Sequence, residues 1–426
     1  MTTQPDKIGT SAGRWLPLLA VIIAGEAIFG LPFVVARVFR PTLLEVFQID
    51  NTSLGLAFGV YGIVAMLAYF PGGLIADRFS PRKLMAGALT LTGLGGLWFV
   101  QIPSLAALSI LYGFWGLSTI FLFWSPMIRV TRSIGGSGGQ GKAFGVLDGG
   151  RGLLAATLAA STVAIFRAFL PESDGEGDLE TKTLALQQVI WMFTGTTFFA
   201  ATLVWFVIPD TIGESSGSSR MDFSKLGAIA KSPAVWLQGC IVVCAYVSYK
   251  GIDNVSLMAR DMFGMDDVGA ASVAMTALWV RPFAAVGAGL LGDRLGGSRT
   301  IVGLFVGVVA MDAMVYFDLW NPTATWVLFS AVITTGVFVY GIRGLYFSIF
   351  QEAGVPAALT GTAAGIVSVL GFTPDIFIGP VNGYFTDTYP GAEGHRLFHG
   401  FLMAFAFAGL LATLAFRRVT RNPPPN

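Results

Sequence analysis

The chain has 426 residues, of which 54% are hydrophobic and 12% charged, and its formal net charge is +1. Ordinary soluble domains carry roughly 25% charged residues, so a soluble core is excluded and lipid must solvate most of this chain. The near-neutral charge gives no indication of nucleic-acid binding. The sequence has no phosphate-binding loop pattern and no nucleophile–base or metal-ligand cluster, so we predict neither an enzyme nor a nucleotide-driven pump, and no cofactor.

Apolar stretches of about 20 residues, long enough to cross a bilayer, follow a polar start. A segment rich in Ser, Gly and charge divides them into two sets of six, as expected of a flexible linker. We therefore predict an all-α membrane protein with twelve transmembrane helices in two pseudo-symmetric six-helix bundles. The predicted parts are a cytoplasmic tail at 1–14, a bundle at 15–208, a cytoplasmic linker at 209–232, a bundle at 233–416 and a cytoplasmic tail at 417–426. The predicted helices lie near 15–39, 53–76, 83–101, 104–128, 143–169, 184–208, 233–258, 268–292, 299–320, 323–348, 357–386 and 395–416.

One charged segment occurs twice, each time between two apolar stretches. Its glycine allows close helix approach, and its aspartate can pair with arginines or a helix end. The offset between the two aspartates is 293 − 77 = 216 residues, close to half of the chain. Two copies in register at this spacing indicate an internal duplication. The copies are 73–83, with Asp77, Arg78 and Arg82, and 289–299, with Asp293, Arg294 and Arg299.

Lysine and arginine are distributed unequally between the predicted loops. With the N-terminus in the cytoplasm, most of the 26 basic residues fall on the cytoplasmic side, as the positive-inside rule requires. The opposite face keeps Arg167, Lys182, Arg260 and Arg396. We therefore predict a multi-pass protein of a bacterial inner membrane with both termini in the cytoplasm.

Two six-helix halves, each with a Gly-x-x-x-Asp-Arg loop after its second helix, resemble the major facilitator superfamily over essentially the whole chain. The resemblance implies alternating access, in which two halves rock about a central site near the midplane. Arg37 and the Asp77 loop that follows are similar to those of the organophosphate and organic-anion branch. That likeness implies basic residues on the first and seventh helices that grip an anionic group, here Arg37 and Lys250, and a polar contribution from Arg151.

Charged residues inside the predicted helices are candidates for function, because a charge at bilayer depth costs on the order of a few kcal/mol or more. Eleven residues separate Glu26 from Arg37, almost a whole number of turns, so both should share one helix face about 16 Å apart. Glu26 is therefore the first choice for proton coupling. The predicted substrate-binding cations are Arg37, Lys250, Arg151 and Arg281, and the predicted proton-coupling acids are Glu26, Asp375, Asp253 and Asp148.

Alternatives stay open for several of these residues. Asp148 with Arg151, and Lys250 with Asp253, are three apart and could neutralise each other on one helix. Arg281, which precedes a proline, could bond a kinked backbone instead of substrate.

Three further groups have weaker assignments. We expect Asp312 to pack helices, and the pair His395 and His399 makes a poor metal site, so we predict no metal. The duplicated loops are predicted gates that pair with arginines at the ends of the fourth and tenth helices when the cytoplasmic side closes. Snorkelling anchors are the alternative. These arginines are Arg129, Arg132 and Arg343.

We predict a monomeric secondary active transporter that moves a small organic anion of the carboxylate, sulfonate or sugar-phosphate type, coupled to protons or by anion exchange. A rival is a proton-driven exporter of hydrophobic or cationic compounds, in which Glu26 and Asp375 matter while Arg37 and Lys250 tolerate neutral replacement. A second rival is a membrane sensor that binds an anion without moving it.

Overall fold

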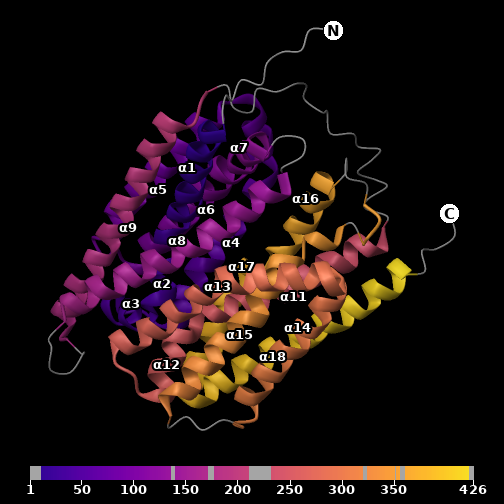
Figure 1. Ribbon diagram of the computed structural model, residues 1–426. Coiled ribbons are helices and arrows are strands. Elements are labelled where there is room, and N and C mark those ends of the chain that lie inside the picture. Colours follow the sequence, from indigo (N-terminus) through magenta and orange to yellow (C-terminus); the bar gives the residue numbers. More distant parts are fainter. Residues whose placement is uncertain are drawn as a thin grey trace, which may run out of the picture.

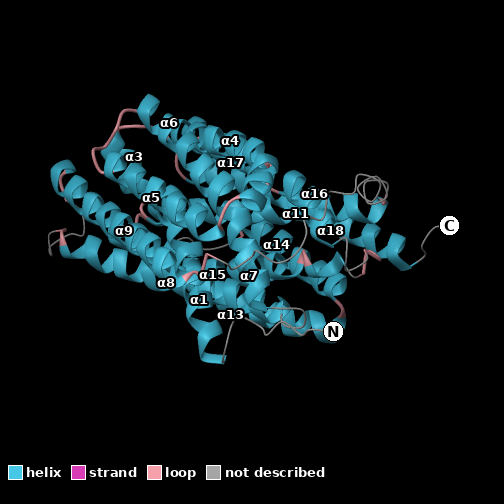
Figure 2. Cartoon of the chain, turned by 90° about the horizontal axis from the view of Figure 1, so that it is seen from above, coloured by secondary structure: helices cyan, strands magenta, loops and turns pink. Residues whose placement is uncertain are grey.

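The computed structural model describes residues 11–135, 140–170, 177–210, 232–319, 324–350, 352–355 and 360–421. These residues form helices joined by short connections, without a strand (Figure 2). The predicted linker, 209–232, lies almost wholly outside the described residues. The first half contains α1 (Ser11–Phe29), η1 (Gly30–Val34), α2 (Val35–Val38), α3 (Arg40–Phe47), α4 (Asn51–Arg78), α5 (Pro81–Phe99), α6 (Leu105–Gly116), η2 (Leu117–Trp124), α7 (Ser125–Gly135), α8 (Gln140–Ala168) and α9 (Leu179–Val207).

The second half repeats this order. Figure 1 shows the first half in indigo to magenta and the second in orange to yellow. The second half contains α11 (Pro233–Gly251), η3 (Ile252–Asn254), α12 (Val255–Phe263), α13 (Asp267–Leu295), α14 (Gly297–Tyr316), α15 (Thr325–Leu345), η4 (Ser348–Phe350), α16 (Thr360–Gly371), α17 (Pro374–Thr388) and α18 (Ala392–Arg421).

The predicted all-α fold with two six-helix bundles is confirmed. Ten crossings in the described residues are long and apolar enough to span a membrane. The other two are α5, whose first turn carries Arg82 and Lys83, and a crossing divided between α16 and α17. Several helices run further than predicted, and the fourth crossing continues to Gly135 rather than 128.

The first crossing is not the continuous α-helix that the Glu26–Arg37 spacing assumed. A π-helical segment, η1, separates α1 from α2. Pro32 within it has no N–H to donate and cannot continue regular i→i−4 bonding. The wider π turn changes the angle between the side chains on either side, and Glu26 and Arg37 contact different partners. The fourth crossing contains a second π segment, η2.

The halves pack closely at one end only. The chain termini and both duplicated loops belong to the "terminus end", and the opposite end, where α4 and α13 begin, is the "far end". A Cβ on Gly55 of α4 would lie 2.3 Å from the Gly379 backbone of α17, and one on Gly62 would lie 2.6 Å from that of Asp375. Gly73 shares this face, eleven residues or about three turns beyond Gly62, yet nothing lies within 4 Å of its Cβ position.

The α8–α13 contact gives the same result. Gly152 of α8 approaches Arg281 and Pro282 of α13 at 3.5 Å. Gly145, two turns nearer the terminus end, meets nothing within 4 Å. The two halves therefore touch at the far end and diverge toward the terminus end.

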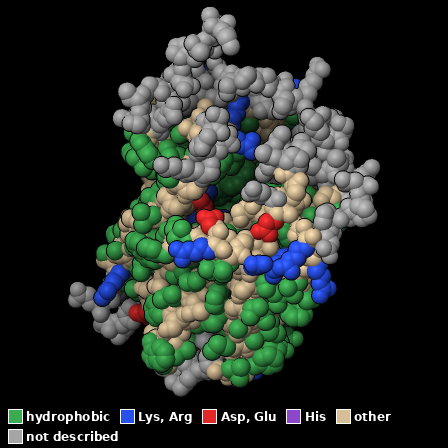
Figure 3. Space-filling model, turned by 45° about the vertical axis from the view of Figure 1, so that its right-hand side comes forward, with side chains coloured by type: hydrophobic (Ala, Val, Ile, Leu, Met, Phe, Trp, Pro, Cys, Tyr) green, Lys and Arg blue, Asp and Glu red, His purple; other side chains and the backbone are tan. Residues whose placement is uncertain are grey.

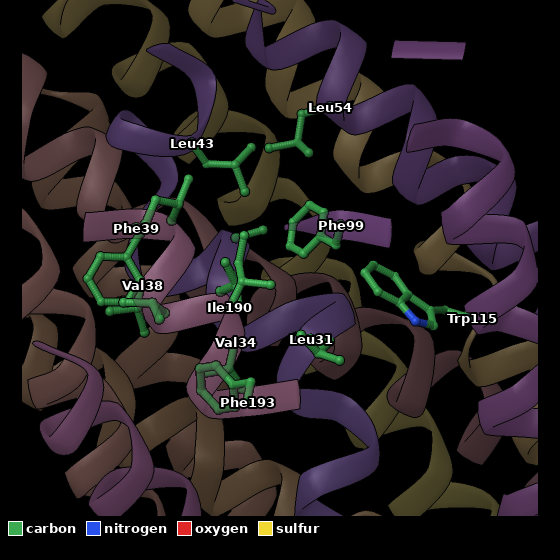
Figure 4. Close-up of a cluster of buried hydrophobic side chains, with 14 of the residues drawn as sticks. Leu31, Val34, Val38, Phe39, Leu43, Leu54, Phe99, Trp115, Ile190 and Phe193 are labelled. Carbon is green, nitrogen blue, oxygen red and sulfur yellow. The ribbon is translucent and has the colours of Figure 1, made fainter. Parts of the chain in front are cut away.

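Apolar cores lie in both halves beside this interface, and the one described below also includes Ala271, Ala274 and Leu278 of α13. In the first half Trp115, Phe99 and Phe193 are fully buried and pack with the end of the first crossing (Figure 4). The Trp115 indole donates to the Thr92 carbonyl at 3.2 Å, so its polar atom is satisfied inside the core. The helices that carry the buried charged residues pack on these cores.

Candidate functional site

Four charged side chains from both halves meet in the buried layer between them. Arg37 donates from Nε to Asp253 Oδ1 at 2.5 Å, and Lys250 Nζ lies 2.8 Å from Asp253 Oδ2. Lys250 Nζ also lies 3.4 Å from Asp375 Oδ1. These side chains are only 5–14% exposed. Removing Asp253 would leave Arg37 without a carboxylate, and removing Lys250 would leave Asp375 without a cation, and a buried ion without its partner is strongly destabilising.

Two tyrosines of α11 connect this layer to a fifth charge. The Tyr249 hydroxyl accepts a hydrogen bond from Arg37 Nη2 at 2.9 Å. On the Tyr249 ring lies the Arg343 guanidinium, 4.0 Å from the centroid, in a cation–π contact. Tyr246 donates to the Asp375 carboxylate at 3.0 Å. Arg343 Nη1 is buried without a hydrogen-bond partner, and no carboxylate in the described part of the chain pairs with Arg343.

A second cluster joins α1, α8 and α13. Glu26 Oε2 lies 3.5 Å from Arg151 Nε and 3.6 Å from Arg281 Nη1. Arg281 Nη2 also donates to Asp148 Oδ1 at 3.4 Å, and the Asp148 side chain is 49% exposed. Arg281 belongs to the second half and its partners to the first, so this cluster also bridges the interface.

The cations outnumber the acids. Arg37, Lys250, Arg343, Arg151 and Arg281 face Asp253, Asp375, Glu26 and Asp148. A sixth cation, Arg40, is 1% exposed and donates to the Asn51 side chain at 2.7 Å and to the Asp253 carbonyl at 3.1 Å. With all groups ionised, the region carries a positive excess.

The structure decides between the sequence-based alternatives for pairing. Lys250 and Asp253 do pair along their helix, but each also bonds across to another helix. Asp148 and Arg151 do not pair with each other, since Arg281 binds the first and Glu26 the second. Arg281 contacts carboxylates rather than a kinked backbone. All eight predicted intramembrane candidates thus belong to one of two clusters.

A third ion cluster lies at the far end. Lys182 Nζ bonds Glu45 Oε2 at 2.8 Å and Asp267 Oδ2 at 3.1 Å. Arg260 Nη1 bonds Asp267 Oδ1 at 3.1 Å and approaches Glu45 Oε2 at 3.5 Å, while Thr42 donates to Asp267 at 3.0 Å. We call Glu45, Lys182, Arg260 and Asp267 the far-end cluster. Sequence reasoning counted two of these residues only as loop charges; their spacing carries no sign that they meet.

The terminus end is open. Figure 3 shows a hollow with acidic and basic side chains at its walls. Of the duplicated loops, Arg78, Asp293, Arg294 and Arg299 are exposed, and the Asp77 side chain lies outside the described residues. Arg82 instead pairs with Asp210, which also accepts from Ser80 at 2.6 Å. The Ser80 hydrogen bond, followed by the charge of Arg82, lowers the pKa of Asp210. Arg129 donates to the Ala76 carbonyl.

The histidines bind separate acids within the second half. His395 Nε2 lies 2.7 Å from Asp261 Oδ2 and its Nδ1 lies 3.0 Å from the Asn254 amide. His399 Nδ1 lies 2.8 Å from Asp312 Oδ1. The described residues contain no group of three potential metal ligands.

Two helical bundles that meet at one end around buried charges define a membrane transporter rather than an enzyme. The chain belongs to the Major Facilitator Superfamily, whose family model matches residues 22–380. It is therefore a multi-pass membrane protein that acts on small molecules.

Similar proteins agree with this assignment. Inner membrane protein YqcE of Escherichia coli (strain K12) is 27% identical over 415 residues, covering 95% of this chain and 94% of that protein. Inner membrane protein YihN of the same organism is 22% identical and covers 96% and 97%. Among solved structures, an inward-facing bacterial homologue of the human lysosomal transporter Spinster has a TM-score of 0.74 at 14% identity, covering 96% of this chain and 98% of that one. The nucleoside transporter NupG, as a mutant, has a TM-score of 0.73 at 12% identity, covering 95% and 99%. At these identities the structures show the shared fold alone.

Proposed function

We propose that this protein carries a small organic anion of the carboxylate, sulfonate or sugar-phosphate type across a bacterial inner membrane by alternating access. Both termini lie in the cytoplasm in this proposal, so the structure is open to the cytoplasm. The names of the Escherichia coli relatives support the membrane assignment. The protein acts as a monomer and couples transport to protons or to a counter-anion.

The observation that carries the proposal is Arg343. Its guanidinium is stacked on Tyr249, its Nη1 is buried and unbonded, and it has no acidic partner among the described residues. Arg343 as a whole is partly exposed, but a buried guanidinium nitrogen left without a hydrogen bond is costly, and an anion from outside would remove that cost. Its planar donors suit a carboxylate, sulfonate or phosphate oxygen pair.

Arg37 and Lys250 form the deeper part of the same site. Their carboxylate partners, Asp253 and Asp375, already occupy the positions that an anionic substrate would take. Substrate therefore reaches these cations when the acids bind protons or move away. Proton binding by the acids would in this way be coupled to substrate binding. Arg151 and Arg281, with Glu26 and Asp148, supply a second group of cations and acids at the interface between the halves.

The duplicated loops act as the gate at the cytoplasmic end in this proposal. As the halves close, the charged side chains of both loops would leave solvent and bind partners. These residues are Asp77, Arg78 and Arg82 in one half, and Asp293, Arg294 and Arg299 in the other. The exposure of Asp293 and Arg299 in an open structure agrees with this role.

The test is a thermal-shift screen of the purified protein against organic phosphates, sulfonates, carboxylates and lipophilic cations, followed by uptake into proteoliposomes. A ligand that binds the native state raises its stability by mass action. We expect one anion class to stabilise the protein, and Arg343→Gln and Arg37→Gln to abolish that shift. Arg418→Gln, which removes an exposed arginine, is the matched control. Stabilisation by cations alone, with Arg343→Gln and Lys250→Gln unaffected, would establish the exporter instead. Anion binding without uptake would establish the sensor.

A further inference from the structure

A second pocket lies inside the second half, away from the interface. Its walls come from the seventh crossing and from α14, α15 and α18, and most of its lining is apolar, including Val308, Val332 and Leu402. Neither Arg37 nor Lys250 lines it. Ser248 and Ile252 line it from the segment whose other face presents Lys250 and Asp253 to the central charges.

One end of this pocket is polar and incompletely satisfied. Asp312 is 3% exposed, and its Oδ1 is bonded to His399. Its other carboxylate oxygen, Oδ2, is buried and has no hydrogen-bond partner. The Ser248 hydroxyl, on the same lining, donates to the Cys244 carbonyl at 3.2 Å, so its oxygen remains able to accept. Buried polar atoms of this kind are nearly always paired, and with Asp312 ionised its Oδ2 only accepts, so the missing partner is a donor.

We propose that this pocket binds the primary ammonium group of an apolar molecule. An ammonium offers three donors and a positive charge, which suit the Asp312 carboxylate and the hydroxyls of Ser248 and Thr335. An anion would be repelled by Asp312, and a quaternary ammonium has no donor to give. The apolar remainder of the lining accommodates an alkyl chain.

The position of the pocket indicates where the ligand comes from. Asp312 lies four residues, about 6 Å, from the far end of α14 at Tyr316, so it lies near one end of this membrane-spanning helix and within reach of a lipid headgroup. Met311, Ala331 and Thr335 are part-exposed, so one wall of the pocket reaches the surface that faces lipid. Both a free alkylamine and an ethanolamine phospholipid supply the required group by this route.

The experiment measures the thermal stability of the full-length protein with n-butylamine, n-butanol and butyltrimethylammonium. We expect a rise of about 2 °C or more for the primary amine at saturation and little change for the other two. Asp312→Asn should abolish the rise, while Asp318→Asn, an exposed acid near the same end, should keep it. Ala331→Phe, which fills the pocket and leaves Asp312 in place, should abolish it as well.

A second arm compares nanodiscs of phosphatidylethanolamine with phosphatidylcholine. Stabilisation by the ethanolamine lipid that is lost in Asp312→Asn identifies a lipid headgroup as the source, and stabilisation by butylamine alone identifies a soluble amine. Three results would overturn the proposal: equal shifts with butylamine and butanol, an amine shift that survives Asp312→Asn, or no shift at all. Water would then be the occupant of the pocket. The anion shift of the central site should persist in Asp312→Asn, because the two sites share no residue.

Discussion

The far-end cluster should set the balance between the open states of the protein, and Asp267→Asn tests this. The Asp267 side chain has no exposed surface, and that of Lys182 is 4% exposed. Lys182–Asp267, Thr42–Asp267 and the longer Arg260–Glu45 contact cross between the halves, whereas Lys182–Glu45 and Arg260–Asp267 stay within one half. Opening the far end therefore costs the crossing contacts alone.

The size of the effect follows from the partners that remain. A buried charge that loses its only partner costs about 3–5 kcal/mol. After Asp267→Asn, Lys182 keeps Glu45, so about 1–3 kcal/mol of the closed-state preference should be lost. That corresponds to a change of roughly 5- to 150-fold in the ratio of closed to open far end.

Distances between spin labels at the far end provide the assay. In a background with Cys240 and Cys244 replaced by Ser, labels at the exposed positions Gln101 and Glu393 report on opposite halves. Asp267→Asn should add a population at longer distance. The control is Asp318→Asn, which removes the Arg396–Asp318 pair inside the second half at the same end. An unchanged distance distribution in Asp267→Asn, or an equal change in the control, would refute the reasoning.

Three further outcomes are expected. Gly55→Ala should lower the melting temperature or open the far end, because its Cβ would lie 2.3 Å from backbone atoms of α17. Gly73→Ala, on the same face with nothing within 4 Å, should do neither. Melting curves and the distances between the same spin labels measure the two effects. Asp210→Asn should lower the melting temperature at pH 7, and this loss should shrink as the pH falls below about 3.9. The depressed pKa of Asp210 adds stability above the unfolded value of about 3.9 that disappears as pH falls through the folded value. Asp253→Asn should leave anion exchange intact but abolish proton-driven accumulation in proteoliposomes, since Arg37, whose carboxylate partner in the described residues is Asp253, then needs no proton to release it; retained pH-gradient-driven uptake would place coupling elsewhere.

The architecture could be predicted because lipid imposes a simple rule on sequence. Each crossing needs a long apolar run, and the two copies of the Asp-Arg loop fix the register of the halves. The membrane also made the candidate charges visible, since Arg37, Lys250 and Asp253 stand out against apolar neighbours. The partners of these charges could not be predicted, because a pair such as Lys250 and Asp375 joins helices more than a hundred residues apart. The contact of Arg343 was also missed: at the end of its helix it was assigned to a gate or to an interface anchor, and only the packing of α15 shows that it lies on the Tyr249 ring.

The duplication holds one signal that would have located part of the site. Arg37 and Asp253 are 253 − 37 = 216 residues apart, the same offset as that of the repeated loops. Glu45 and Arg260 are 215 apart. Halves related by an axis along the membrane normal bring equivalent positions face to face on that axis. Equal charges there would repel, so pairing required one copy to become acidic and the other basic. The attraction between the halves at these points therefore depends on sequence differences between the two copies. Adding 216, the offset of the repeated loops, to the residue number of each intramembrane charge pairs Arg37 with Asp253. It does not recover Lys182 with Asp267 or Glu26 with Arg281, because those pairs lie away from the axis, where no repeat relates the two partners.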